Sequence, residues 1–446
     1  MKKVELLSPA GTLESLRYAL AYGADAVYAG MPRYSLRARN NEFKNLNPLE
    51  EGISHTHALG KKFFLAVNLM PHNGKVDTFI RDLAPAIELK PDAVIMSDPG
   101  LIMMVRERWP DMPIHLSVQA NTVNYASVNF WKSMGLARII LSRELSIKEI
   151  GEIRDRCSDI ELEVFIHGAL CIAYSGRCLL SGYFNHRDSN QGTCTNSCRW
   201  EYRLTDVQET EEGTLFPLTT PLQQEGAPPR HPAADQAYLI EEMGRRQNEW
   251  MEINEDEHGT YIMNSRDLRA IRHVKQLIDM GIDSLKIEGR TKSHYYAART
   301  AQIYRQAIDE ALAGKEFNTG LLTALDGLAN RGYTEGFYDR HSNNETQNYT
   351  DGASSTYTQQ YVASVLSYDE TSGLSTLEVR NRFFAGDTIE VIRPQSLGGN
   401  HTLVLKELFD KNGAPIEVAP GSGHIVQARI GLADPMSMLA RVVTTS

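Results

Sequence analysis

A short apolar run followed by an amphipathic stretch recurs along the first two thirds of the chain, and this alternation limits the folds available to it. The runs end in small or polar residues, and the stretches between them, such as LESLRYALAYG and IKEIGEIRDRC, place apolar residues at helical spacing. The eight runs are VELLSPA (4–10), DAVYAG (25–30), KFFLAVN (62–68), DAVIMSD (92–98), IHLSVQ (114–119), RIILSRE (138–144), LEVFIHG (162–168) and SLKIEG (284–289).

Strand then helix, repeated in this way, predicts an α/β fold, a (β/α)8 TIM-like barrel whose interior is packed by Val, Ile and Leu. An open, doubly wound parallel sheet is the runner-up, although no G-x-G-x-x-G follows the first run. In a barrel the carboxyl ends of all strands open at one face. Active sites of barrel enzymes lie at that face.

The alternation breaks between the seventh and eighth runs. A cysteine segment occupies residues 169–200, and residues from about 205 to 258 are acidic and proline-rich with little apolar periodicity, which indicates a surface insertion. We therefore expect a barrel domain over residues 1–342, which includes both of these parts. A polar linker over 343–360 and a small β-barrel domain over 361–446, with period-two alternation between Gly and Asn-Gly turns, complete the chain.

The composition is that of an ordinary globular protein, with 42% hydrophobic and 23% charged residues. A formal net charge of −10 argues against a general nucleic-acid coat, but it is compatible with a local basic face. The first residues lack the apolar stretch that secretion requires, and no run is apolar enough to span a membrane. We therefore expect a cytoplasmic protein, in which clustered cysteines bind metal or do redox chemistry rather than form disulfides.

Four of the five cysteines lie in the cysteine segment: Cys171, Cys178, Cys194 and Cys198, with six, fifteen and three residues between them. Four thiolates can hold an iron–sulfur cluster or a structural zinc ion. Zinc sites usually use two closely spaced pairs, and only the second pair fits, so the spacing favours the cluster over zinc and over unrelated thiols. Cys157 belongs to a helical pattern and is interpreted as a bystander.

The residues that end the runs would face one bowl at the carboxyl ends of the strands. Ser97 and Asp98 precede Pro99 and are better explained as helix caps, and Ser146 before IKEI is expected to cap the next helix in the same way. Gln119, Asn121, Arg143 and Arg290 are harder to explain in that way, and for them substrate contacts weigh evenly with structural roles. The full set is Ser8, Tyr28, Asn68, Ser97, Asp98, Gln119, Asn121, Arg143, Glu144, His167, Glu288 and Arg290.

Eight residues of the cysteine segment and the run before it match a family signature. Glu163, Phe165, Gly168, Ala169, Cys171, Gly176, Cys178 and Ser181 fit the signature of the collagenase-like peptidase family U-32 at every fixed position. LLSPAG, LKIEGRTKSHYYAARTAQIYRQAID and RGYTEGF also resemble blocks of that family. The resemblance covers the chain from residue 4 to about residue 340.

Within this family the chain is most similar to members that hydroxylate tRNA, through HGALCIAYSGRCLLSGY, NQGTCTNSCRWEY and EDEHGTYIMNS. The resemblance implies prephenate-dependent formation of 5-hydroxyuridine at the wobble position of tRNA, the first step toward 5-carboxymethoxyuridine. It also implies that Cys171, Cys178, Cys194 and Cys198 are ligands of an iron–sulfur cluster, with the 4Fe–4S form favoured. Other members of the family hydroxylate ribosomal RNA or ubiquinone precursors.

Prephenate carries two carboxylates, so its site should offer guanidinium groups, which bind carboxylates through two hydrogen bonds. Arg143, Arg177 and Arg290 are candidates by position. The loop PRYSLRARNNEFK adds Arg33, Arg37 and Arg39 around Tyr34. This loop is either a solvated surface loop or a clamp in which Tyr34 stacks on a base turned out of a tRNA loop.

Two alternatives stay open. The family name suggests a collagenase-like peptidase, but H-E-x-x-H and G-x-S-x-G are both absent, so the remaining possibility is a nucleophilic Cys171 paired with His167. His167 is otherwise better interpreted as a structural residue than as a base. The second alternative is a non-catalytic RNA-binding protein braced by zinc. No residue identifies the catalytic group with certainty, and His167, Gln119 and Asn121 are the candidates.

Overall fold

The computed structural model describes residues 4–36, 42–170, 174–175, 177, 266–328, 330, 332–339 and 359–443, and the backbone of five further strands between residues 207 and 261.

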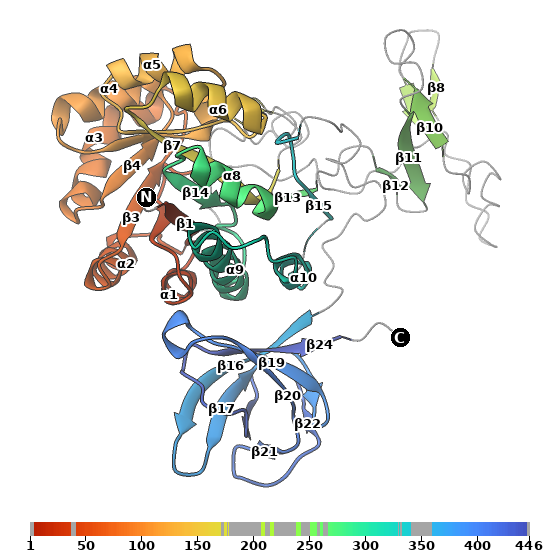
Figure 1. Cartoon of the computed structure of the whole chain (residues 1–446). Coiled ribbons are helices and arrows are strands. Elements are labelled where there is room, and N and C mark those ends of the chain that lie inside the picture. The colour runs from red at the N-terminus through yellow and green to blue at the C-terminus, as the bar shows by residue number, and fades with distance from the viewer. Residues whose placement is uncertain are drawn as a thin grey trace.

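Eight parallel strands form a closed barrel, which helices surround (Figure 1). Neighbouring strands pair in chain order, and the last, β14, pairs with both β1 and β7, which closes the ring. All eight predicted runs are strands, so the TIM-like barrel is confirmed and the open sheet is wrong. The strands are β1 (Glu5–Pro9), β2 (Ala26–Gly30), β3 (Lys62–Val67), β4 (Ala93–Met96), β5 (Ile114–Leu116), β6 (Arg138–Ile140), β7 (Glu161–Ala169) and β14 (Ser284–Ile287).

The helices follow the strands in the predicted order. Asp98 caps the helix that begins at Pro99 and accepts a hydrogen bond from the backbone N–H of Leu101, and Ser146 forms a reciprocal capping box with Glu149. The predicted caps Asp98 and Ser146 are therefore confirmed, whereas the Ser97 hydroxyl donates instead to the backbone oxygen of Asn68 at 2.9 Å. The helices are α1 (Leu13–Ala21), α2 (Leu46–Ala58), α3 (Asn73–Glu88), α4 (Pro99–Arg108), α5 (Tyr125–Ser133), α6 (Ile147–Arg156), α8 (Val274–Asp279), α9 (His294–Leu312) and α10 (Gly320–Asp326).

The barrel interior is more polar than predicted. Arg138 reaches across it, with its Nη1 atom 2.6 Å from Glu5 Oε1 and 3.0 Å from Glu163 Oε2, and its guanidinium lies over the ring of Phe64. Lys286 Nζ lies 2.8 Å from Glu163 Oε1. Because side chains alternate along a strand, the buried Val, Ile and Leu residues next to these positions face the helices instead. The aliphatic side chains therefore lie between the strands and the helices, and the ion pairs of Arg138 and Lys286 lie inside the barrel.

A short extra sheet extends β7 beyond the barrel. The strand β13 (Asp267–Arg269) pairs antiparallel with the end of β7 and parallel with β15 (Tyr333–Thr334). Asp267 lies opposite Ala169, so the chain leaves the barrel and returns to it at neighbouring positions. No strand was predicted here, and β13 is followed by a 3-10 turn (Ile271–His273) and α8.

Five short strands lie in the excursion between β7 and β13. The predicted surface insertion thus contains paired backbone, although its sequence shows little periodicity. Among the described residues, β8 pairs with β9 and β11 pairs with β10 and β12, and none of these strands pairs with a barrel strand (Figure 1). They are β8 (Val207–Glu209), β9 (Leu215–Pro217), β10 (Tyr238–Glu241), β11 (Trp250–Asp256) and β12 (Gly259–Tyr261).

The C-terminal part is an antiparallel β domain, as predicted. Its seven-stranded sheet has the order β20-β19-β24-β16-β17-β23-β21, and β18 pairs with β22. The first strand begins at Gln359, two residues before the predicted boundary at 361, and the rest of the predicted linker lies outside the described residues. The strands are β16 (Gln359–Asp369), β17 (Leu374–Val379), β18 (Phe383–Phe384), β19 (Thr388–Ile392), β20 (His401–Val404), β21 (Leu408–Asp410), β22 (Val418–Ala419), β23 (Ile425–Ala428) and β24 (Met438–Val442).

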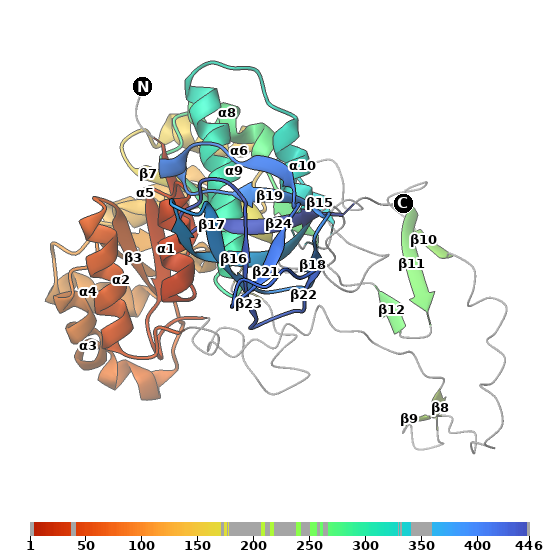
Figure 2. The same ribbon diagram turned by 90° about the horizontal axis from the view of Figure 1, so that it is seen from below.

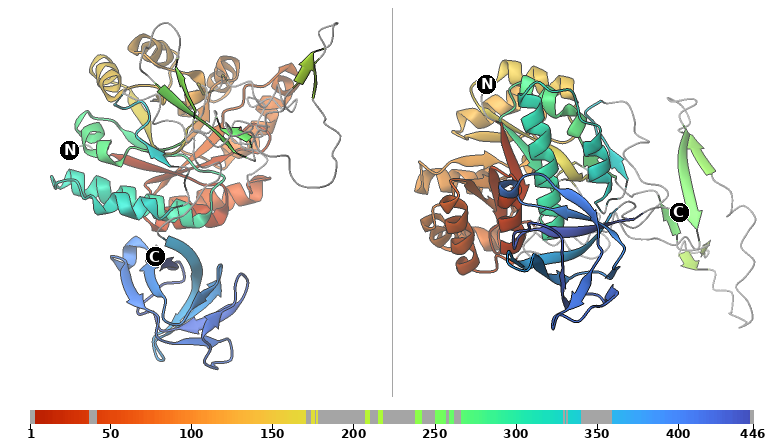
Figure 3. Two further views of the ribbon diagram at one scale, coloured as in Figure 1. Left: turned by 90° about the vertical axis from the view of Figure 1, so that its right-hand side faces the viewer. Right: turned by 60° about the horizontal axis from the view of Figure 1, so that its bottom comes forward.

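The β domain packs against helices α1 and α9 on the flank of the barrel (Figures 2 and 3). The Tyr22 hydroxyl donates to the backbone oxygens of Ile392 and Met436, each at 2.9 Å. The ring of Tyr295 stacks on that of Tyr361, with 4.7 Å between ring centres. None of the helices in the described part of the chain has the length and apolarity that a membrane span needs.

Candidate active site at the carboxyl ends of the barrel strands

Tyr28, at the end of β2, lies beside Glu288, which follows β14. The Tyr28 hydroxyl is 3.1 Å from Glu288 Oε2 and 3.1 Å from the backbone oxygen of Ile287. Burial, and then the charge of Glu288, raise the pKa of Tyr28 well above its usual value. The hydroxyl therefore stays protonated at neutral pH and donates to an acceptor at the mouth of the barrel.

Arg143 joins this pair from the end of β6. Its Nη2 atom is 3.8 Å from Glu288 Oε2, and its Nη1 atom donates to the backbone oxygen of Ala169 at 2.6 Å. The guanidinium carbon lies 3.9 Å from the centre of the Phe165 ring, a favourable cation–π position. The Nη1 atom of Arg143 thus binds the end of β7, where the cysteine segment begins, and the Nη2 atom lies on the side of Glu288.

Two further cations approach the same aromatic rings. Arg290 is 8% exposed, donates from Nη1 to Ser35 Oγ at 2.8 Å, and lies 5.6 Å from the centre of the Tyr28 ring. Lys286 Nζ lies 4.3 Å from that ring centre. Three cationic side chains, Arg143, Lys286 and Arg290, are therefore gathered at one opening, where an anionic group of a substrate would be stabilised.

Glu163 lies directly below this group. Burial by itself would raise the pKa of Glu163, but Lys286 and Arg138 outweigh that effect and hold the pKa below its usual value. The carboxylate is therefore ionised at neutral pH and balances Lys286. Sequence reasoning did not single out Lys286, because a lysine inside an apolar run gives no sign of facing the barrel interior.

Asn121 and Gln119 follow β5. Asn121 adopts the left-handed backbone conformation (φ 57°), and its Nδ2 atom donates to the backbone oxygen of Ser175 at 2.9 Å. Its Oδ1 atom is 3.2 Å from the Ser142 hydroxyl. Gln119 is half-buried in a 3-10 turn. Asn121 is thus brought to the cysteine segment, and the described contacts give it a positioning role.

His167 is enclosed by aromatic rings rather than open to the mouth. It is 1% exposed, and the ring centres of Tyr296, Tyr304 and Tyr333 lie 5.8, 5.4 and 5.5 Å from its own. Its Nδ1 atom is 3.3 Å from the Tyr304 hydroxyl. Burial lowers the pKa of His167 to about 3, so the ring is neutral. These surroundings fit a structural residue and do not favour a base paired with Cys171.

Tyr34 does not have the surroundings expected of a base-stacking residue. Its side chain is fully buried, its ring packs edge-on against Phe79, and its hydroxyl is 2.9 Å from both Asp82 Oδ2 and Thr78 Oγ1. Arg33 is held at 2.7 Å by the same Asp82 carboxylate. The expectation that Tyr34 stacks on a tRNA base is therefore corrected, because its polar end anchors the loop to α3.

Several predicted residues lie outside the described part of the chain, and Arg177 is described only as a short piece of the cysteine segment. Arg177 is exposed, and its backbone N–H donates to the Tyr174 backbone oxygen at 3.0 Å. Arg37 and the predicted ligands Cys171, Cys178, Cys194 and Cys198 lie outside the described residues. Their donor set of four thiols fits a thiophilic metal centre. Leu170, which precedes Cys171, is buried at the end of β7, so the segment starts from the rim.

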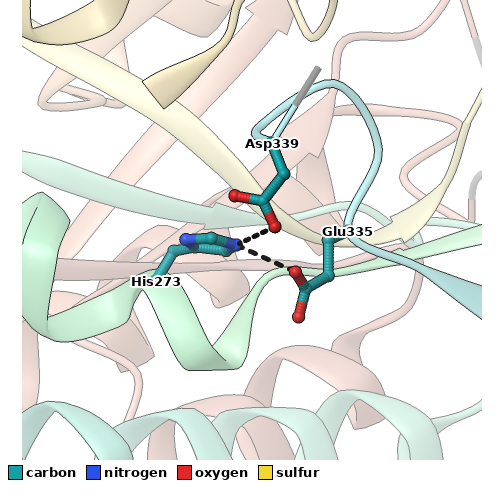
Figure 4. A group of neighbouring side chains, drawn as sticks. All are labelled: His273, Glu335 and Asp339. Carbon is teal, nitrogen blue, oxygen red and sulfur yellow. Dashed lines mark hydrogen bonds and ion pairs between the residues drawn. The ribbon is translucent and has the colours of Figure 1, made fainter. Parts of the chain in front are cut away.

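A second cluster of side chains joins the 3-10 turn Ile271–His273 to the segment that follows β15. His273 Nε2 is 3.2 Å from Glu335 Oε2 and 3.7 Å from Asp339 Oδ2 (Figure 4). Burial and then the hydrogen bond with Asp339 raise the pKa of Glu335. Arg272 Nε is 3.7 Å from the other oxygen of Glu335. Arg272 and His273 thus link the 3-10 turn that precedes α8 to the segment that follows β15.

The protein is thus built on a TIM-like barrel, with an antiparallel β domain on its flank and a cysteine-bearing sequence that follows β7. The model of peptidase family U32 matches residues 11–348, and that of the peptidase family U32 C-terminal domain matches residues 357–441. The chain belongs to peptidase family U32.

Curated relatives match over nearly the whole chain. The tRNA hydroxylation protein P of Escherichia coli is 57% identical, covering 96% of this chain and 93% of that protein. The protein of the same name from Haemophilus influenzae is 55% identical, covering 95% and 92%. The tRNA hydroxylation protein P1 of Bacillus subtilis is 35% identical, covering 96% and 92%.

Proposed function

We propose that this protein is an RNA-modifying hydroxylase that acts on tRNA. The observation that carries the proposal is the similarity to tRNA hydroxylation protein P of Escherichia coli and of Haemophilus influenzae, at 57% and 55% identity over both domains. Identity at this level extends over both domains, so it says more about function than a shared fold alone would. The finer proposal is that the product is 5-hydroxyuridine at the wobble position, the first step toward 5-carboxymethoxyuridine.

Prephenate is the proposed co-substrate, and the mouth offers groups that suit a dicarboxylate. Arg143 and Arg290 approach the mouth from β6 and β14, and Lys286 lies between them beneath the Tyr28 ring. Glu288 is 3.8 Å from Arg143, longer than a hydrogen bond, so a substrate carboxylate could compete for the outward arm of that guanidinium. Tyr28, protonated at neutral pH, can donate to the same anion.

The four thiols of Cys171, Cys178, Cys194 and Cys198 are the proposed ligands of an iron–sulfur cluster, in the 4Fe–4S form. When bound, such a cluster supplies electron transfer or Lewis-acid chemistry. The chain's own contribution is to position the segment: Arg143 holds the Ala169 carbonyl where the segment begins. The rings of Tyr296 and Tyr304 pack against His167, three residues before Leu170, which is the last described residue ahead of Cys171.

For tRNA, the proposal requires a local basic surface, because the chain as a whole carries a net charge of −10. Arg177, which is exposed beside the mouth, and Arg37 are the proposed contacts. The buried Tyr34 is not among them. An unpaired wobble base would have to be turned out of the anticodon stack to reach the mouth, as other base-modifying enzymes require.

The experiment that tests the function is nucleoside analysis of tRNA from a strain that lacks this gene and every redundant route to the same nucleoside. Loss of wobble 5-hydroxyuridine, restored by the wild-type gene and not by Cys171→Ala, is expected. Persistence of the nucleoside would reject the proposal. Cleavage of gelatin that survives Cys171→Ala would indicate a peptidase that uses other residues.

The experiment that tests the cofactor is the measurement of iron and acid-labile sulfide per chain in protein purified without oxygen. A brown protein with a broad absorption near ~400 nm is expected of a thiolate-bound cluster. A colourless protein that holds one zinc ion would reject the cluster and favour a zinc-braced segment.

A further inference from the structure

A pocket of about 540 Å³ lies between the loop that follows β2, the start of α2 and the middle of α3. The buried part of its lining is largely apolar, since Met31, Leu49 and Ala86 are each at most 4% exposed. Leu46 also lines the pocket and is 38% exposed. A pocket of this volume with an apolar floor suits a flat ring system better than a hydrated ion.

The pocket lies beside the barrel mouth. Its wall includes Arg33 and Tyr34, and the next residue, Ser35, accepts a hydrogen bond from Arg290 Nη1 of the mouth at 2.8 Å. Because Arg33 and Ser35 are two residues apart in the chain, their α-carbons are separated by at most about 7 Å. A polymer with one unit in the mouth can therefore place a neighbouring unit in the pocket.

Positive charge surrounds the pocket. Arg33 and Lys44 line it, and both residues are exposed to solvent. Burial, and then the charge of Arg33, lower the pKa of Lys75 on α3, so these cations are close enough to repel one another. The first turn of α2, all of it described, carries no acidic side chain, and Leu46 of this turn lines the pocket. The positive end of the helix dipole therefore adds to the same potential.

The carboxylate of Asp82, which also lines the pocket, is already paired. Its Oδ2 atom lies 2.7 Å from Arg33 Nη1 and accepts from the Tyr34 hydroxyl at 2.9 Å. Burial by itself would raise the pKa of Asp82, but the hydrogen bonds from Tyr34 and Thr78 outweigh it and hold the pKa below its usual value. Asp82 is thus ionised at neutral pH and holds Arg33 at the pocket.

Arg33 adopts a backbone conformation that costs free energy. Its φ is 69°, in the left-handed region that residues other than Gly and Asn seldom enter. Such conformations persist where the surrounding structure enforces them, and they are concentrated at ligand-binding and catalytic sites. The ion pair with Asp82 and the position of the guanidinium 5.6 Å from the centre of the Tyr34 ring enforce it here. The strained residue therefore brings its charge to this pocket.

We propose that this pocket binds a nucleotide that neighbours the modified one in the tRNA, with its base against Met31 and Leu46 and its phosphate near Arg33 and Lys44. The inference rests on the proposed function, because it takes the RNA chain to be the polymer that enters the mouth. Unstacked bases pack on apolar and aromatic side chains, and phosphates are attracted to Lys and Arg, so a nucleotide matches both parts of the lining. An acidic peptide would match the charge and leave the apolar floor uncovered.

The test uses two variants of the full chain, each with a matched control. Leu46→Glu sets a negative charge against the proposed base and phosphate, and it suits the positive end of α2, so the helix should be kept. Its control is Met103→Glu, at a 52% exposed apolar residue of α4. Arg33→Asn replaces the cation by a residue that tolerates the left-handed conformation. Its control is Lys90→Asn, because Lys90 is also an exposed cation with positive φ (59°) and lies between α3 and β4, at the opposite end of the barrel.

Binding of an anticodon stem-loop RNA with an unmodified wobble uridine is measured by fluorescence anisotropy at several salt concentrations, with the melting temperature as a check on folding. Two further RNAs keep every phosphate but lack the base on one or the other side of that uridine. We expect Leu46→Glu to weaken binding of the intact RNA on the order of 10-fold, and to have much less effect on one of the two abasic RNAs. Arg33→Asn should reduce the steepness of log K against log salt concentration by about 0.7, the value for one phosphate contact in a single strand. Both controls should bind like the wild type.

Three outcomes overturn the inference in different ways. If both variants bind the intact RNA like their controls, the pocket takes no part in RNA binding, while the proposed function stands. If Leu46→Glu weakens binding of all three RNAs equally, no base enters the pocket. Wild-type protein that binds the stem-loop no more tightly than an unrelated RNA of the same length would reject the proposed function and the inference together. Should Leu46→Glu melt far below its control, the salt dependence of Arg33→Asn decides alone.

Discussion

Asp267 lies directly opposite Ala169 in the antiparallel pairing of β13 with β7, so the chain leaves the barrel and re-enters it at adjacent positions. Ala270 N–H donates to the Ile166 oxygen at 2.8 Å and extends this closure toward the barrel. The chain between Ala169 and Asp267 is therefore an excursion from the barrel. Because the described strands β8 to β12 pair only with one another, the part of the chain that carries them is predicted to be thermodynamically separable from the barrel.

The first prediction follows from this closure. Replacing residues 205–262 by a short Gly-Ser linker should change the melting temperature of the barrel by only a few degrees, since β7 and β13 stay paired. Replacing residues 205–269 instead removes β13, including the buried Leu268, and should lower it much more. Thermal unfolding followed by circular dichroism makes the comparison; equal losses in the two proteins would contradict the prediction.

The second prediction concerns pH. The pKa of His167 is about 3 in the folded chain and about 6.5 in the unfolded chain, so below pH 6.5 the unfolded chain binds a proton that the folded chain does not. The stability associated with neutral His167 is present above pH 6.5 and is lost as pH falls toward 3. Between pH 7.5 and 5.5 this loss is on the order of 1 kcal/mol.

The variant His167→Asn keeps a polar atom near Tyr304 and should lack this pH-dependent contribution to the free energy of unfolding. Urea unfolding of both proteins at pH 7.5 and 5.5 measures this contribution. The difference in the free energy of unfolding between wild type and variant should be smaller at pH 5.5 by on the order of 1 kcal/mol. A gap that is the same at both pH values would mean that His167 titrates normally in the folded chain.

The third prediction concerns Arg143, which shares its guanidinium between the Ala169 carbonyl and the mouth. Arg143→Lys keeps the charge but cannot make both contacts at once. Loss of one charge-assisted hydrogen bond, about 1.5–3 kcal/mol, should raise the KM for prephenate on the order of 10-fold or more. Steady-state kinetics on tRNA measures this, with exposed Arg108→Lys as the control; a KM equal to that of the control would rule out a substrate contact.

The fourth prediction concerns the buried pair of Glu163 and Lys286. Glu163→Gln leaves Lys286 without its buried counter-charge and should destabilise the barrel by about 3–5 kcal/mol. The double variant Glu163→Gln, Lys286→Met removes both charges and should recover part of that loss. Chemical unfolding of the three proteins decides this, and a double variant less stable than Glu163→Gln would show that Lys286 is stabilised mainly by other groups.

The sequence was sufficient for the features that depend on neighbouring residues. Apolar runs bounded by small residues identified all eight barrel strands, and Asp98 and Ser146 were recognisable as caps because a cap acts on N–H groups two or three residues away. The candidate residues at strand ends follow from the same pattern, since parallel strands in a closed barrel all end at one face.

The features that depend on distant partners could not be read in this way. β13 is three residues long, and its partner in β7 lies about a hundred residues earlier, so no local pattern marks it. Tyr34 looked available because its loop is polar, and only the approach of Asp82 and Thr78 from α3 buries its ring. Side chains alternate between the two faces of a strand, but this alternation does not show which face points to the barrel axis. The ion pairs of Glu163 could therefore not be predicted from the sequence.

The sequence by itself thus determined the barrel, its β domain and the order of residues around the mouth, because these follow from short-range periodicity and turn chemistry. The tertiary structure decided which of those residues are free to act. It enclosed His167 in tyrosine rings, divided Arg143 between the β7 end and the mouth, and set Asn121 against the turn at Ser175. Such pairings are made by chain segments that meet only after folding, so no spacing along the chain encodes them.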